Sequence, residues 1–199
     1  MPVSPARSAA FDILLRVERE HSYASELLHS ERCAELSATD HGLTTELVFG
    51  VVRWLSTLDS VIAQASSKAV SKLDPEVLTA LRLGTYQLLY LDRIPARAAI
   101  HESVELVKRA RKRSAAPFVN AVLRKLSAES RAPALAEAAT GAPELAELLA
   151  HPVWIVERWI NQFGFEIAKT ICAFDQQVPQ TNIRLRDATV AHDLAAHNV

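Results

Sequence analysis

Apolar residues recur at helical spacing through almost the whole of residues 5–127, and this repeat constrains the fold more than any other feature. In one group, Leu47, Val48 and Val51 lie three and four positions apart, which places their side chains on one face of a helix. Few stretches alternate with a period of two, and only five residues are glycine. The repeat therefore predicts an all-α domain without a strand. We expect its core to contain Leu14, Leu47, Val51, Leu81, Leu88, Val104, Val107, Val122 and Leu123.

Capping residues and prolines predict several helix boundaries within this domain. Thr39 or Asp40 is expected to cap one helix. A shorter helix is expected around 23–33 and a longer one over 97–112, and a turn at 114–117 leads into the last helix of the domain.

The composition changes after residue 127. Residues 128–143 are rich in Ser, Ala, Pro, Thr and Gly and have little apolar periodicity, which predicts a linker. Residues 144–199 are expected to form part of a small α+β subdomain, with a helix that begins at Pro152 and stops at Gly164. Alternating apolar residues predict a strand near 180–186.

The positive charge is concentrated in one segment. Residues 97–125 contain eight Lys or Arg and two Asp or Glu, a net charge of +6, within a chain whose net charge is −1. Cations at helix C-termini complement the helix dipole, but this accounts for only one or two at each end. We therefore predict a nucleic-acid-binding surface, with a solvated helix face as the alternative. The predicted contact residues are Lys108, Arg109, Arg111, Lys112, Arg113, Arg124 and Lys125.

No arrangement of nucleophiles or metal ligands indicates an active site in this chain. Cys33 and Cys172 are far apart and outside any C-x-x-C pattern, so we expect two buried thiols. His101-Glu102 lacks the second histidine of a zinc motif. We assign no catalytic, cofactor-binding or metal-binding residue. For the three tryptophans, packing in a core is favoured over stacking on bases: Trp54, Trp154 and Trp159.

Targeting signals are not indicated either. Residues 1–16 lack the basic and apolar regions of a signal peptide, and no run of about 18 apolar residues occurs. We expect a soluble, cytoplasmic protein that does not associate with a membrane.

Several stretches of the sequence resemble one known family, in its order and with its spacing. The segment T-E-L-V-F-G-V-V-R-W at 45–54 is similar to T-E-L-V-Y-G-V-L-R-W in the Sun/Fmu/RsmB family of bacterial ribosomal-RNA cytosine-5 methyltransferases. The similarity continues through 73–75, 81–89, 94–95, 102–108 and 118–124. This resemblance implies that residues 5–127 have the NusB-like RNA-binding fold of the family's N-terminal domain.

The segments after residue 150 also resemble that family. H-P-V-W at 151–154 and P-Q-T-N-I-R at 179–184 resemble the subdomain that precedes its methyltransferase core, and free-standing NusB factors end before such a segment. The family's loop for S-adenosylmethionine and its cysteine nucleophile have no counterpart in this chain. The chain is therefore expected to end before the core, to bind no cofactor and to be inactive by itself.

Three functions remain open at this point. The first is a module that targets an rRNA cytosine-5 methyltransferase to ribosomal RNA. Its expected partners are small-subunit ribosomal RNA and a methyltransferase domain in cis or in trans. The second is a stand-alone transcription antitermination factor that binds RNA and a ribosomal protein. The third is a protein-interaction domain whose basic helix is simply solvated.

Overall fold

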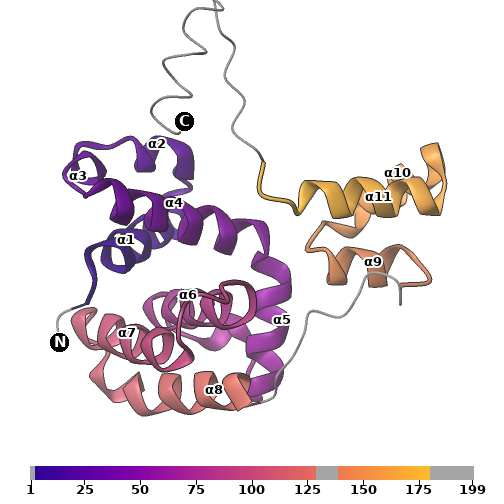
Figure 1. The fold of residues 1–199 in the computed structure, drawn as a ribbon. Helices are drawn as coiled ribbons and strands as arrows, with labels where there is room; N and C mark the ends of the chain where they lie inside the picture. The colour runs from indigo at the N-terminus through magenta and orange to yellow at the C-terminus, as the bar shows by residue number, and fades with distance from the viewer. Residues whose placement is uncertain (1–2, 129–138, 180–199) are drawn as a thin grey trace, which may run out of the picture.

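The computed structural model describes residues 3–128 and 139–179, and every regular element within these ranges is a helix (Figure 1). The predicted all-α fold is thereby confirmed. The predicted strand near 180–186 lies outside the described residues. The larger unit contains α1 (Pro5–Glu20), α2 (Ala24–Leu28), α3 (Glu31–Ala34), α4 (Ala38–Arg53), α5 (Leu55–Ser66), η1 (Val70–Lys72), α6 (Pro75–Tyr90), α7 (Ala96–Arg109), η2 (Arg113–Ala115) and α8 (Ala116–Ala128).

Helix α6 is the centre of the larger unit. Every residue from Val77 to Gln87 is buried, because α1, α4, α5, α7 and α8 all pack around it. A helix covered on all sides must be apolar nearly all round, and the 77–83 stretch meets that requirement with Val, Leu and Ala at most positions. Of the nine predicted core residues, seven are buried, while Leu88 and Val104 are partly buried and pack against the same core.

Three boundaries differ from the sequence prediction. The cap of α4 is Ser37, whose hydroxyl accepts a hydrogen bond from the Asp40 N–H at 3.1 Å. The segment expected as one helix around 23–33 is two short helices, α2 and α3. Helix α7 ends at Arg109 rather than at 112, since Arg111 has a φ of 62° and cannot continue a right-handed helix.

A buried arginine connects three helices of this unit. The Arg82 guanidinium of α6 forms two hydrogen bonds of 2.7 Å to the Asp59 carboxylate of α5 and one of 2.9 Å to Glu18 of α1. Burial lowers the pKa of Arg82, but the two carboxylates outweigh it and the pKa is raised overall. Arg82 therefore stays charged and holds α5 against α6 and α1.

A smaller unit follows, with α9 (Ala142–Leu148), α10 (Val153–Phe163) and α11 (Phe165–Asp175) around a core of its own. Helix α9 was not predicted, because the linker was expected to run through residue 143 and the next helix to begin at Pro152. Most of that linker lies outside the described residues. At the corner between α10 and α11, Gly164 has φ 84° and ψ 164°, a conformation that is essentially restricted to glycine.

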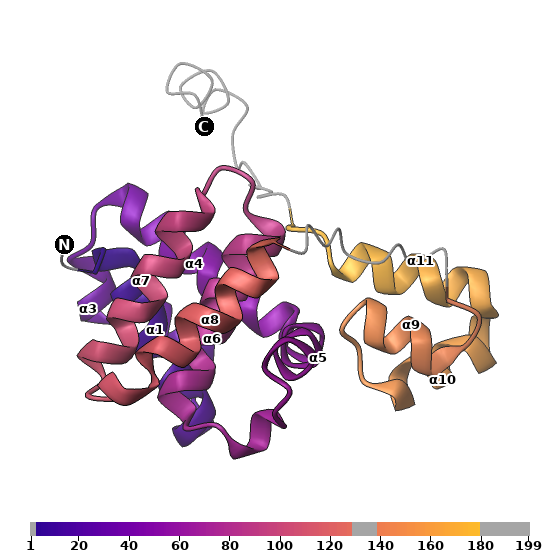
Figure 2. The ribbon, with the colours of Figure 1, turned by 90° about the horizontal axis from the view of Figure 1, so that it is seen from below.

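The two units meet where α5 contacts α9 (Figure 2). The Thr57 hydroxyl donates to the Glu147 carbonyl at 2.9 Å, and the Ser60 hydroxyl donates to the Glu147 carboxylate at 3.0 Å. Trp54 packs against both cores. Among the helices described, none is both long and apolar enough to cross a membrane.

Candidate nucleic-acid interface

A groove of about 590 Å³ separates the outer surfaces of α7 and α8. The short turn at 110–115 reverses the chain, so the two helices lie side by side (Figure 2). The residues that line the groove are Ala96, Arg97, Ile100, His101, Val104, Glu105, Lys108, Asn120, Arg124, Ser127 and Ala128.

Helix α7 contributes one wall through a single stripe of residues. Arg97, His101 and Lys108 lie four and seven positions apart, which brings their side chains to the same face. The opposite face of α7 carries Leu106 and Val107, which are buried in the core. The amphipathic pattern of α7 thus fixes a polar stripe along the groove.

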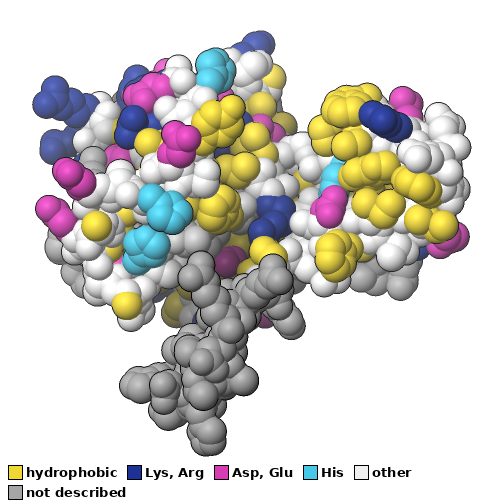
Figure 3. Space-filling model, turned by 90° about the horizontal axis from the view of Figure 1, so that it is seen from above, with side chains coloured by type: hydrophobic (Ala, Val, Ile, Leu, Met, Phe, Trp, Pro, Cys, Tyr) yellow, Lys and Arg dark blue, Asp and Glu magenta, His cyan; other side chains and the backbone are white. Residues whose placement is uncertain are grey.

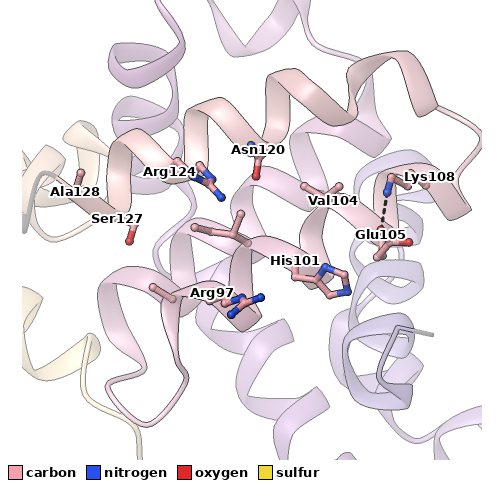
Figure 4. A pocket seen from close by; sticks show the side chains of 11 residues that line it. Arg97, His101, Val104, Glu105, Lys108, Asn120, Arg124, Ser127 and Ala128 are labelled. Atoms are coloured by element: carbon pink, nitrogen blue, oxygen red, sulfur yellow. Dashed lines mark hydrogen bonds and ion pairs between the residues drawn. The ribbon is translucent and has the colours of Figure 1, made fainter. Parts of the chain in front are cut away.

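Helix α8 contributes the facing wall in the same way. Asn120, Arg124 and Ser127 lie four and three positions apart on one face, whereas Val122 and Leu123 are buried behind them. Figure 4 shows Arg124 and Asn120 of α8 facing the same space as Arg97 and His101 of α7. The groove therefore brings cations from two helices together beside amide and hydroxyl groups.

The charges in the groove do not cancel. Lys108 donates to the Glu105 carboxylate at 2.6 Å, and this hydrogen bond lowers the pKa of Glu105. Within residues 3–128 and 139–179, neither Arg97 nor Arg124 has a salt-bridge partner. Two arginines thus remain to attract an anion, and arginine is well suited to bind phosphate in two-pronged geometry.

The structure divides the seven predicted contact residues among several places. Lys108 and Arg124 line the groove. Arg111 and Arg113 are exposed at the turn beside the C-terminal end of α7.

The other three predicted residues have partners in the fold. Arg109 forms an ion pair with Asp12 of α1. Lys112 contacts Asp74 at 2.9 Å, and hydrogen bonding to that carboxylate raises the pKa of Lys112. Lys125 donates to the Ala65 carbonyl of α5 at 3.3 Å, on the side of α8 that faces α5.

Arg97 and His101 were not predicted as part of this surface. The dense run of cations at 108–113 indicated a different set of residues, whereas the groove follows one face of each helix. The spacing of Arg97, His101 and Lys108 was a usable signal, because residues four and seven apart share a face of any helix. Because α7 ends at Arg109 and not at residue 112 as expected, Arg111 and Lys112 do not continue the helix face that carries Lys108.

The three tryptophans differ in how far they are buried. Trp54 and Trp159 are partly buried against the cores, as predicted, but the prediction for Trp154 is wrong, since 63% of its surface is exposed.

Cys33 and Cys172 are both buried free thiols, as predicted. Burial raises the pKa of Cys172 to about 11, which makes its thiol a poor nucleophile at neutral pH. Among the described residues, no group of three side chains is placed to hold a metal ion.

Comparison with known proteins finds a matching family and a similar relative. The NusB family matches residues 4–128. The probable ribosomal RNA small subunit methyltransferase B of Bacillus subtilis is 36% identical over 186 residues, which are 93% of this chain and 41% of that protein. The chain thus spans less than half the length of this relative.

Two solved structures extend the comparison of folds. The crystal structure of antitermination factors NusB and NusE in complex with dsRNA matches with a TM-score of 0.58 and 27% identity, over 63% of this chain and 95% of the other. The crystal structure of PH0851 matches all of this chain and 46% of its own, with a TM-score of 0.68 and 14% identity. The second match shows a shared fold alone, and it includes the smaller unit.

Proposed function

This chain belongs to the NusB family over residues 4–128, and from that membership we propose that it is the RNA-binding module of a ribosomal-RNA methyltransferase. It binds RNA through the α7–α8 groove. The exposed cations Arg111 and Arg113, with Lys112 between them, extend the contact surface past the end of α7. The bound RNA belongs to the small ribosomal subunit.

The groove is the observation that carries this proposal. Arg97 and Arg124 face one another across it without salt-bridge partners among the described residues, and Asn120 and Ser127 lie beside them. Cations held on rigid helices release counterions when they neutralise phosphates, which gives sequence-independent affinity. The amide of Asn120 can form hydrogen bonds with a base edge.

The extent of similarity favours a methyltransferase module over a stand-alone antitermination factor. The B. subtilis methyltransferase is similar to 93% of this chain, whereas the NusB structure matches 63% of it. The NusB family match ends at residue 128, so the α9–α11 unit lies outside it. The chain then places RNA for a methyltransferase domain, in cis or in trans, and that domain binds S-adenosylmethionine.

A salt series tests the RNA-binding proposal. The probe is a single-stranded fragment of small-subunit ribosomal RNA, with a fragment of scrambled sequence beside it. If about four cations contact phosphates, the slope of log affinity against log salt concentration is near −3. Changing Arg97 and Arg124 together to Ala should weaken binding to both fragments and flatten the slope by about 1.4 units. Changing Arg111, Lys112 and Arg113 together to Ala should flatten it by up to about 2 units.

The matched control removes two cations from the smaller unit. Arg158→Ala with Lys169→Ala changes the net charge by the same amount as the groove variant, and both residues lie far from α7 and α8 in the chain. This control should keep the affinity and the slope. A folded groove variant that binds with unchanged affinity and slope would show that RNA does not bind in this groove.

A further inference from the structure

Helix α11 has apolar side chains on two faces, and only one of these faces is fully covered. Ala168 and Cys172 are fully buried against the rest of the smaller unit. On the other side, Ile167 is 54% exposed and Phe174 is 70% exposed. The apolar set continues along the helix and just past its end, with Ile171 half-buried and the other three exposed, and we call it the α11 stripe: Ile167, Ile171, Phe174 and Val178.

Exposed apolar surface is concentrated on this small unit. Six of the ten exposed large hydrophobic residues lie within 139–179, although that range is about a third as long as 3–128. Figure 3 shows hydrophobic side chains gathered on the unit that contains α9, α10 and α11. A helix that is apolar on both sides is normally buried on both, and a contiguous patch of this kind marks an interaction site. The α11 stripe therefore requires a partner.

The charge of the unit argues that this partner is a protein rather than RNA. Residues 139–179 contain two Lys or Arg and five Asp or Glu, a net charge of −3. RNA affinity depends on cations, and the only cation of α11 is Lys169. An apolar stripe on an acidic unit instead fits a protein surface that is apolar at its centre and basic at its rim.

We propose that the α11 stripe is the docking surface for a methyltransferase domain. This inference rests on the proposed function and adds to it the surface that holds the two parts together. The unit that carries the stripe lies after the residues 4–128 that match the NusB family, and similarity to the B. subtilis methyltransferase covers 93% of the chain. The smaller unit thus belongs with the methyltransferase rather than with the RNA-binding fold. Its uncovered face is where that association buries apolar surface.

Co-expression tests this proposal directly. The full chain is produced together with the part of the B. subtilis methyltransferase that lies outside the 186 matched residues. A tag on the full chain should recover a 1:1 complex. Ile167→Glu and Phe174→Glu should each lower the affinity about tenfold or more, because each places a charge in a desolvated contact. Circular dichroism of each variant checks that the fold is kept.

A matched control and an RNA measurement separate this inference from the proposed function. Tyr23→Glu places the same charge at a residue that is 73% exposed on the larger unit, and it should leave the complex intact. The stripe variants should bind RNA like the unaltered chain. The Arg97→Ala, Arg124→Ala variant should lose RNA affinity and keep the complex. If the unaltered chain recovered the methyltransferase part but did not bind RNA, the proposed function would be contradicted and the docking surface would stand.

Three results would overturn the docking surface. The first is failure of the unaltered chain to recover the methyltransferase part. The second is a complex that survives both stripe variants. The third is a dimer of this chain, detected by light scattering, that dissociates when the stripe is altered, since a second copy would then be the occupant.

Discussion

At the scale of single residues, the close packing of α4 against Tyr86 of α6 depends on Gly50 of α4. A Cβ atom at this position would lie 2.0 Å from the ring of Tyr86 in α6. The Tyr86 hydroxyl donates to the Glu46 carboxylate at 2.5 Å, and burial, followed by this carboxylate, raises the pKa of Tyr86. Glycine thus allows the ring to lie across α4 and to reach Glu46.

We predict that Gly50→Ala destabilises the fold by roughly 1–3 kcal/mol, because the Tyr86 ring must move and the core is overpacked. Urea unfolding followed by circular dichroism measures the loss. Gly42 lies in the same helix with no atom within 4 Å of its would-be Cβ. Gly42→Ala should therefore stabilise the protein by about 0.5–1 kcal/mol. Equal effects of the two substitutions would show that the contact with Tyr86 is unimportant.

At the scale of helices, Gly164 determines how α10 turns into α11. Its φ of 84° and ψ of 164° are strained for any residue with a Cβ. We predict that Gly164→Ala destabilises the smaller unit by about 1–3 kcal/mol. Tryptophan fluorescence can follow this unfolding, because Trp154 and Trp159 both lie in α10.

Gly141 provides the control for this corner. It has a φ of −155°, and its would-be Cβ meets only the Pro143 side chain at 3.8 Å. Gly141→Ala should change stability by a few tenths of a kcal/mol at most. If both glycine substitutions proved harmless, the corner would have to tolerate a conformation other than the one observed.

The helices were predictable where burial repeats every three or four residues. Leu47 and Val51 of α4 and Leu123 of α8 mark buried faces that the periodicity located correctly. Helix α9 was missed because it is only seven residues long and follows a segment rich in Ala, Pro and Gly. A single turn or two of helix gives too few repeats for periodicity to register.

The candidate site was less predictable, because it depends on which face of each helix is outward and on where each helix ends. Lys108 and Arg124 were identified, but Arg97 and His101 were not, since they stand outside the dense run of cations. The pairing of Lys112 with Asp74 and of Arg109 with Asp12 joins residues far apart in the chain. No local pattern encodes such contacts.

At the scale of the whole molecule, two hydrophobic cores share one residue, Trp54. Its ring stacks on Tyr90 of α6 with centroids 4.6 Å apart, and it also contacts the core of the smaller unit. Only Thr57, Ser60 and Glu147 add hydrogen bonds between α5 and α9 in the described chain. Trp54 therefore links the stability of the two units.

We predict that Trp54→Ala lowers stability by about 3 kcal/mol and separates unfolding into two transitions. The remaining tryptophans both lie in α10, so fluorescence should report the smaller unit unfolding first, while circular dichroism reports both. Trp54→Phe retains an aromatic ring beside Tyr90 and should keep one transition. A single transition in Trp54→Ala would mean that the two units are coupled by other contacts.

Helix α5 also fixes the distance between the α7–α8 groove and the smaller unit. One of its sides contacts α8, which forms a wall of the groove, and its N-terminal half contacts α9. Arg82 anchors it through Asp59. Its 12 residues span about 18 Å. If RNA occupies the groove and an enzyme occupies the α11 stripe, this helix fixes the distance between the bound RNA and the enzyme. The length of α5 then helps to determine which nucleotide lies within reach of the enzyme's active site.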